Sequence, residues 1–212
     1  MIEIYSATIC PFAQRVRAVL THLGQPFEVK TVDLSNRDPE FFRISPTGLI
    51  PLLLDGAFKL YESQIIIEYL AEKHGWRTAL SADLGLRARQ RLAMKQWDST
   101  VITAWYRSVK DPETFDARTR EKVEKELDEL HMTVRRMAAD VDNLLAFHSA
   151  PFWARMDWLR GHSPVTPLVD GRAALREWLD RTVQLRAIQQ TLPDREWTVQ
   201  QYLEVHARPG RA

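Results

Sequence analysis

The side chain best suited to chemistry in this sequence is the thiol of Cys10, the only cysteine among 212 residues. Ile2 and Ile4 predict a short strand before it, and Pro11 suits the first position of a helix. A sulfur at a helix start meets unpaired N–H groups and the positive end of the helix dipole, which favour the thiolate. We therefore expect a pKa below the ordinary value of about 8.5 and a nucleophilic thiolate. The alternative is a buried, inert cysteine.

The residue at position 13 restricts what this thiolate can do. A dithiol oxidoreductase would carry a second cysteine there to resolve a mixed disulfide, but the sequence has Ala13. Cys10 can therefore exchange only with a thiol from outside the chain, and a small thiol such as glutathione would be used twice in each reductive cycle. Arg15 and Arg17 add positive charge nearby.

Two further motifs suit a peptide-like ligand. Ile50-Pro51 follows a loop and precedes a predicted strand, so a cis bond there would turn the Ile50 backbone groups towards the Cys10 region. Ser63 can cap a helix whose free N–H groups bind a carboxylate, and Glu62 can receive an ammonium group. The plainer alternatives are a trans proline that starts an edge strand, and an ordinary helix cap beside a solvated Glu62.

These motifs lie on a predicted βαβαββα order over residues 1–76. The expected elements are strands at 2–5 and 27–34, helices at 11–23 and 38–44, a hairpin at 52–61 that turns at Asp55-Gly56, and a helix opened by Ser63. The first two strands should be parallel, and the hairpin should add an antiparallel edge.

After residue 76 only helical patterns remain. We assign residues 77–86 to a linker and 87–212 to an all-α helical domain. The helices are expected at 84–109, 115–138, 144–160, 171–190 and 198–206. Pro112, Pro164, Pro167 and Pro193 fall between them, where proline is tolerated.

Composition argues against several functions. The net charge of +1 argues against a nucleic-acid-binding function. The six histidines lack the spacing of metal ligands, so we expect no bound metal. No run of about 18 uncharged apolar residues is present, so we expect no membrane segment, and the first residues lack a signal-peptide pattern. A single cysteine forms no intrachain disulfide, which fits a reducing, cytoplasmic location.

Together these motifs resemble the glutathione transferase superfamily over nearly the whole chain. Cys10-Pro11-Phe12-Ala13-Gln14-Arg15 is similar to the active-site motif of its cysteine-type branches, the omega and lambda classes and their bacterial relatives. The segments 45–52, 61–70 and 150–193 resemble its cis-proline loop, its γ-glutamyl-binding turn and its later helices. The resemblance implies a thioredoxin-like α/β domain at 1–76 fused to the helical domain. One departure concerns the core helix, which could begin at Asn143, without the family's acidic capping partner, or at Ala139-Asp140.

The resemblance also implies roles for single residues. Cys10 would be the catalytic thiolate. The backbone of Ile50, before Pro51, would pair with the cysteinyl part of glutathione, and Glu62 with Ser63 would hold the γ-glutamyl end. Arg37 lies where the family often places a basic residue for the glycyl carboxylate.

The second substrate would lie between the domains. Phe12 would contact both glutathione and this substrate, and the other candidate pocket residues are Trp97, Ile102, Trp105 and Tyr106. The alternative for each of these side chains is packing in the core or in a dimer.

Three functional hypotheses remain. The first is a glutathione-dependent thiol transferase or reductase, which resolves mixed disulfides or reduces dehydroascorbate-type substrates through Cys10. The second is a conjugating or isomerising enzyme, in which Tyr5, Ser6 or Thr8 activates glutathione. The third is a non-catalytic binding protein with the same fold. The resemblance implies a homodimer in each case.

Overall fold

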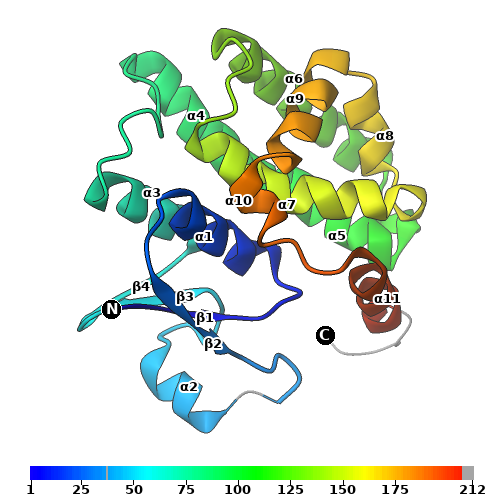
Figure 1. Cartoon of the computed structure of the whole chain (residues 1–212). Helices are drawn as coiled ribbons and strands as arrows, with labels where there is room; N and C mark the ends of the chain where they lie inside the picture. The colour runs from blue at the N-terminus through cyan, green and yellow to red at the C-terminus, as the bar shows by residue number, and fades with distance from the viewer. Residues whose placement is uncertain (37, 207–212) are drawn as a thin grey trace.

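The computed structural model describes residues 1–36 and 38–206, and Figure 1 shows a small sheet beside a larger group of helices. The strands are β1 (Ile2–Ser6), β2 (Phe27–Thr31), β3 (Leu52–Asp55) and β4 (Phe58–Tyr61). The helices interleaved with them are α1 (Pro11–His22), α2 (Pro39–Ile44) and α3 (Ser63–Lys73). The βαβαββα order is therefore confirmed.

The sheet has the strand order β2-β1-β3-β4. β1 and β2 are parallel, with Ile2 opposite Phe27, whereas β3 is antiparallel to both β1 and β4. Both predicted pairings are confirmed. The hairpin turn lies one residue later than expected, because Asp55 pairs with Phe58 and leaves Gly56 and Ala57 as the loop. Gly56 has a φ of 62°, a conformation that glycine adopts without a steric penalty.

The remaining elements are helical, as expected. They are α4 (Leu84–Gln96), the π-helical segment Trp97–Ile102, α5 (Thr103–Lys110), a 3₁₀ turn (Pro112–Thr114), α6 (Ala117–Arg136), α7 (Leu144–Trp158), a second 3₁₀ turn (Arg160–His162), α8 (Val165–Asp170), α9 (Ala173–Val183), α10 (Arg186–Gln189) and α11 (Arg195–His206). None of the helices in the described part of the chain is long and apolar enough to cross a bilayer.

Three helical predictions need correction. The helix expected at 171–190 is two helices, because Leu185 has an extended ψ of 129° between α9 and α10. Helix α8 was not expected, and Pro167 lies inside it as the third residue. A proline in the first helical turn removes no intrahelical hydrogen bond, so Pro167 does not end the helix. The expected linker at 77–86 also overlaps the first turn of α4, which begins at Leu84.

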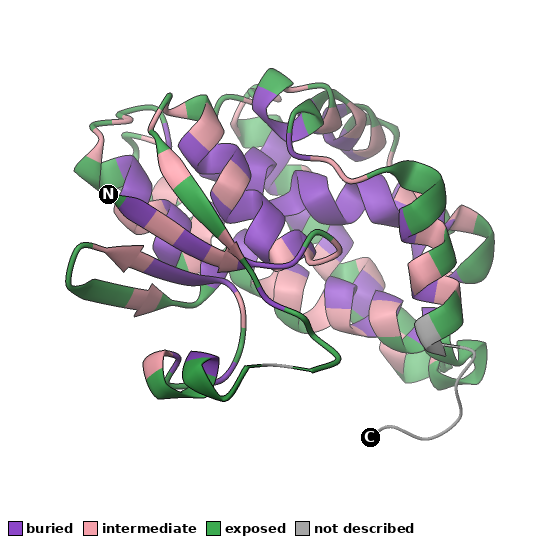
Figure 2. Cartoon of the chain, turned by 60° about the horizontal axis from the view of Figure 1, so that its bottom comes forward, coloured by how far each residue is buried: buried purple, intermediate pink, exposed green. Residues whose placement is uncertain are grey.

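The two possible starts of α7 are resolved in favour of Asn143. Its side-chain oxygen accepts a hydrogen bond from the N–H of Ala146 at 3.1 Å, while its amide group donates to the Asp140 carbonyl at 2.8 Å. Helix α7 is buried along most of its length, as Figure 2 shows for the central helices.

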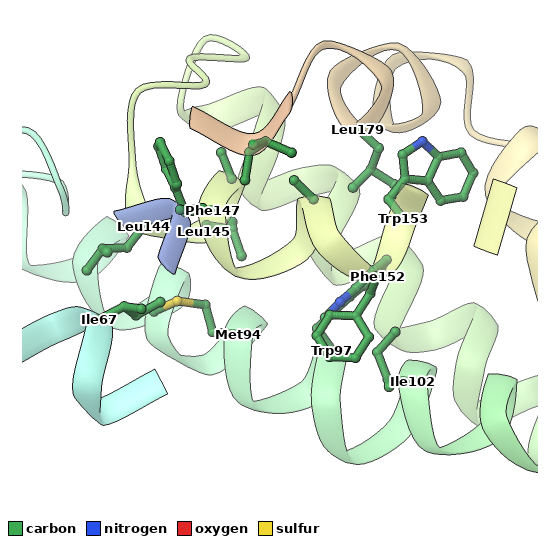
Figure 3. Close-up of a cluster of buried hydrophobic side chains, with 14 of the residues drawn as sticks. Ile67, Met94, Trp97, Ile102, Leu144, Leu145, Phe147, Phe152, Trp153 and Leu179 are labelled. Carbon is green, nitrogen blue, oxygen red and sulfur yellow. The ribbon is translucent and has the colours of Figure 1, made fainter. Parts of the chain in front are cut away.

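A hydrophobic core runs from the sheet into the helices. It includes Val16 of α1 and Ile67 of α3, and Figure 3 shows Trp97 and Ile102 lying beneath Phe152 of α7. Helices α1 and α7 pack directly against each other. The start of α1, which carries Cys10, is therefore fixed from the helical side as well as from the sheet.

Candidate active site

Cys10 occupies the N-cap position of α1 and is half-buried. Its backbone N–H donates to the Ala7 carbonyl at 3.0 Å, and its carbonyl accepts the N–H of Gln14 at 3.0 Å. The predicted junction between strand and helix is confirmed, with Pro11 as the first helical residue. The sulfur therefore lies beside N–H groups of the first turn, which have no intrahelical acceptor.

The electrostatic effect on the sulfur has the opposite direction from our prediction. Burial raises the pKa of the Cys10 thiol, and this effect outweighs the lowering by the backbone N–H groups of Ala13 and Phe12 and by the charges of Arg155 and Arg15. The expected lower pKa is therefore wrong. The groups that stabilise the thiolate are present as predicted, but removal of water from the sulfur has the larger effect.

Arg155 of α7 is a site residue that the sequence did not single out. It is fully buried, and its guanidinium donates to the Ile9 carbonyl at 3.2 Å, to Gln14 Oε1 at 2.6 Å and to the Pro151 carbonyl at 2.7 Å. It therefore ties α7 to the residue that precedes Cys10. A lone charged residue within the apolar run from Leu144 to Met156 is a signal that could have identified it.

The Ile50-Pro51 peptide bond is cis, as the family resemblance implied. Ile50 is partly buried and lies just before β3, outside the sheet ladder. Within the described residues its backbone N–H and C=O have no hydrogen-bond partner. An extended, peptide-like molecule could pair with both groups.

The turn at Glu62-Ser63 differs in detail from the prediction. Glu62, not Ser63, occupies the N-cap position of α3, and Ser63 is the first helical residue. Glu62 is exposed and has a φ of 68°, a conformation that non-glycine residues adopt rarely. No side chain caps α3, so the N–H groups of its first turn remain available for an anion.

Ser63 instead belongs to a cluster of four side chains, which we call the Arg15 cluster: Arg15, Ser63, Asp98 and His148, all buried except the partly exposed Asp98. Arg15 Nη1 donates to Ser63 Oγ at 3.2 Å, and Arg15 donates to both carboxylate oxygens of Asp98 at 2.9 Å. His148 Nε2 lies 3.1 Å from Asp98 Oδ1. The sequence predicted charge from Arg15 but not Asp98 or His148, whose contact depends on how the helices pack.

Charges explain the ionisation of this cluster. Burial alone would raise the pKa of Asp98, but Arg15 and His148 together hold it well below its usual range. Burial and the charge of Arg15 lower the pKa of His148 against the opposing effect of Asp98. The cluster therefore contains an Asp98 carboxylate bound to the Arg15 guanidinium, and the His148 imidazole beside them is neutral.

The candidate residues for the second substrate fall into two groups. Trp97, Ile102 and Trp105 are at most 1% exposed and belong to the hydrophobic core, in agreement with the packing alternative. Phe12 and Tyr106 are only partly buried. The Phe12 ring packs edge-on against Phe152 at 4.8 Å.

Tyr202 of α11 was not predicted to belong to the site. Its hydroxyl lies 3.2 Å from that of Tyr106, and the two rings stack at 6.1 Å with an interplanar angle of 11°. Burial, and to a lesser degree the charge of Cys10, raises the pKa of both tyrosines. The C-terminal helix therefore brings a phenol group near the thiol.

The remaining predictions concern Arg37, the three hydroxyl groups proposed to activate glutathione, and the absence of a metal site. Arg37 lies outside the described residues. The Tyr5 ring packs against Phe41 at 5.6 Å, Ser6 is 2% exposed within β1, and Thr8 is exposed. No group of three or more potential metal ligands occurs in the chain as described, residues 1–36 and 38–206.

Comparison with known proteins agrees with this geometry. A family model described as "Glutathione S-transferase, N-terminal domain" matches residues 4–78. Glutathione S-transferase omega-1 of Mus musculus is 29% identical over 161 residues, which span 74% of this chain and 63% of that protein. A probable glutathione transferase of Aplysia californica is 32% identical over 83 residues, which span 39% of this chain and 90% of that protein.

The fold is also that of a solved structure. Glutathione transferase Omega 1C from Trametes versicolor superposes with a TM-score of 0.79 at 21% identity, covering 97% of this chain and 96% of its own. For three plant and mammalian relatives, the match spans between 40% and 63% of their own length. The fold, the sequence matches and the arrangement around Cys10 lead to one conclusion: the chain belongs to the glutathione S-transferase family.

Proposed function

We propose that the protein is a glutathione-dependent thiol transferase of the omega type, with Cys10 as its catalytic residue. The observation that carries this proposal is the position of the only sulfur nucleophile at the start of α1, with Ala13 in place of a resolving cysteine. The chain can then exchange disulfides only with an external thiol. The omega class of the murine and fungal relatives supports the same choice.

The proposed reaction has two exchange steps. The Cys10 thiolate attacks the glutathione sulfur of a mixed disulfide, and the substrate leaves as a thiolate that takes up a proton. A second glutathione thiolate then attacks the Cys10–glutathione disulfide. This step releases oxidised glutathione and restores the Cys10 thiolate, so the substrate leaves as a thiol and one added glutathione is oxidised, joined in the product to the glutathionyl group that came from the mixed disulfide.

Glutathione would bind along the three motifs described above. The Ile50 backbone groups would pair with its cysteinyl part, and the first turn of α3 with Ser63 would hold the γ-glutamyl carboxylate. Glu62 would accept the α-ammonium group, and Arg37 would receive the glycyl carboxylate. Phe12 and Tyr106 have the partly exposed surface needed to contact a second substrate.

One observation favours a second function, the conjugation of glutathione to an electrophile. Burial raises the pKa of Cys10, which disfavours the thiolate that disulfide exchange requires. In a conjugating enzyme Cys10 would form no bond to glutathione, and another group would stabilise the glutathione thiolate. Thr8 is exposed near the end of β1 and is the available hydroxyl.

Intact-mass analysis after incubation with oxidised glutathione separates these functions. The thiol transferase forms an adduct with one glutathione, which a reducing agent removes and which Cys10→Ser lacks. Glutathione conjugation to an electrophile without adduct formation would favour the second function. A chain that neither forms the adduct nor conjugates glutathione would be the non-catalytic binding protein.

We also propose a homodimer that works in the reducing cytoplasm, where glutathione is kept reduced. Large apolar side chains are exposed on α3 and α4, namely Ile65, Leu84 and Leu92, which are 50%, 74% and 50% exposed. Arg91 of α4 forms an ion pair with Glu68 of α3, so the two helices meet, and a second copy would cover their exposed apolar side chains.

A further inference from the structure

Arg17 of α1 is a partly buried arginine that the proposed reaction does not use. Its Nε and Nη2 atoms are shielded from solvent, and within residues 1–36 and 38–206 neither atom has a hydrogen-bond partner. These two atoms share the edge of the guanidinium plane that binds two oxygens of a carboxylate or phosphate through parallel hydrogen bonds. An unpaired buried donor costs free energy, so this edge calls for an acceptor that the described chain does not supply.

Arg155 of α7 supplies a second guanidinium group without a carboxylate. It is 0% exposed, and it donates to the neutral oxygens of the Ile9 carbonyl and the Gln14 side chain. Its Nε atom has no partner in the part of the chain that the structure describes. Arg15, by contrast, has the Asp98 carboxylate as its counterion. Two of the three guanidinium groups around the sulfur therefore carry positive charge that no carboxylate of the described residues pairs with.

The helix geometry brings these two charges to the side of α1 that carries Cys10. Cys10, Gln14 and Arg17 follow one another at spacings of four and three residues, so they lie along one face of the helix. A long helical side chain leans towards the N-terminus of its helix, which for Arg17 is the end with Cys10. Gln14 Oε1 accepts from Arg155 at 2.6 Å on the same face. Consistently, burial and the charge of Arg155 lower the pKa of Arg17, and the charge of Cys10 raises it.

We propose that Arg17 and Arg155 form an anion-binding subsite beside Cys10, which takes an oxyanion group (carboxylate, sulfonate or phosphate) of the second substrate. The unpaired edge of Arg17 binds the oxygens, and the buried charge of Arg155 adds to the attraction. The role of this anion as part of a second substrate rests on the proposed function. Glutathione brings two carboxylates of its own, but these have separate places at the start of α3 and at Arg37 in the proposed binding mode. The subsite therefore selects acidic partners for the reaction at Cys10.

Alkylation of Cys10 by two reagents of nearly equal size tests this subsite. Iodoacetate carries a carboxylate and iodoacetamide is neutral, and the same thiolate displaces iodide from both. The ratio of their rate constants, measured by intact mass, therefore cancels any change in the pKa of the thiol. We expect Arg17→Gln to lower the iodoacetate-to-iodoacetamide ratio about tenfold, because one attractive charge is lost. Arg17→Lys keeps the charge and should stay within about threefold of the wild-type ratio.

Arg135 provides a matched control, because it is exposed on α6, which packs on α4 and α9. Arg135→Gln removes the same charge and should leave the ratio unchanged. A wild-type ratio in Arg17→Gln, or an equal fall in Arg135→Gln, would overturn the subsite. If Arg17→Gln does not fold, sulfate decides the question in the wild-type chain. At constant ionic strength sulfate should slow iodoacetate alkylation to a limiting rate, and a rate that ignores sulfate would overturn the subsite.

Failure of the subsite and failure of the proposed function give different results. A chain that forms the glutathione adduct but shows no effect of Arg17→Gln on the ratio keeps its proposed function and lacks the subsite. If neither reagent modifies Cys10 in the folded chain, the proposed function fails, and sulfate binding then decides the subsite. Sulfate at constant ionic strength should raise the urea midpoint of the wild type and of Arg135→Gln more than that of Arg17→Gln. Equal shifts in all three chains would overturn the subsite.

Discussion

Tyr106 and Tyr202 join their hydroxyl groups at 3.2 Å across 96 residues of sequence. This bond fastens α11 to α5, and the charge of Cys10 acts on both hydroxyl groups. Either hydroxyl can be the donor, so the two tyrosines can exchange the roles of donor and acceptor when a ligand forms a hydrogen bond with one of them.

Removal of one partner of this pair should destabilise the protein. We expect Tyr202→Phe to lower the free energy of unfolding by about 1 kcal/mol, because the partly buried Tyr106 hydroxyl loses its hydrogen-bond partner. Urea unfolding measures the loss. The double variant Tyr106→Phe/Tyr202→Phe should lose less than the sum of the single variants, and strict additivity would show that the hydroxyls do not interact.

The pH dependence of Cys10 alkylation should reflect its burial. The midpoint for reaction with iodoacetamide should lie above that of the unfolded chain, which has the ordinary value of about 8.5, because burial raises the pKa of the folded thiol. The same reaction in urea is the control. A native midpoint at or below the urea value would contradict the burial effect and restore our original prediction.

Acid should destabilise the fold in two stages. The lowered pKa of His148 means that the unfolded chain binds a proton more readily, so stability should fall as pH drops below about 6.5. The lowered pKa of Asp98 has the same sign and should reduce stability further below about pH 4. Urea unfolding at several pH values measures both stages, and His148→Gln should flatten the first. A variant with an unchanged profile between pH 5 and 7 would exclude His148 as the cause.

The N-cap of α7 gives a test of the helical region. Asn143→Ala should lower the free energy of unfolding by about 1–2 kcal/mol, because the N–H of Ala146 loses its acceptor. Asn143→Asp keeps an acceptor oxygen and should recover most of this loss in urea unfolding. Equal losses in the two variants would mean that the bond from Asn143 to the Asp140 carbonyl is the important one.

Charge on the proposed dimer face should separate the subunits. Leu92→Glu should convert a dimer to a monomer in light scattering, since a carboxylate would be buried without a partner. Trp197 is a matched control, because it is 41% exposed and lies on α11, which packs against α7. Dissociation by Trp197→Glu, or a wild-type chain that is already monomeric, would refute the proposed face.

Local sequence patterns were sufficient to predict the order of strands and helices in the thioredoxin-like region. Alternating residues, Pro11 and the Asp55-Gly56 pair predicted its strands, its first helix and its hairpin, because each signal is decided within a few residues. The same local reasoning failed at two places. At Leu185 the apolar spacing is helical on both sides of the break, so the sequence predicted one helix instead of two. The sequence predicted a loop at Pro167, although this residue lies in the first turn of α8.

Contacts between distant residues could not be predicted from the sequence. Arg155 contacts the residue before Cys10 across 146 positions, and Asp98 meets Arg15 across 83, so only the packing of α7 and the π-helical segment brings them together. The prediction that the pKa of Cys10 would be lowered was wrong for the same reason. The helix start was visible in the sequence, but the surrounding side chains that exclude water were not.

The single sulfur has a practical consequence for experiments on the native chain. A fluorinated or fluorescent tag that reacts with thiols would attach at Cys10 and nowhere else, without any engineered residue. Because the charge of Cys10 acts on Tyr106 and Tyr202, such a tag would lie close to the contact between α5 and α11. The protein therefore carries its own attachment point for a reporter of the environment at this contact.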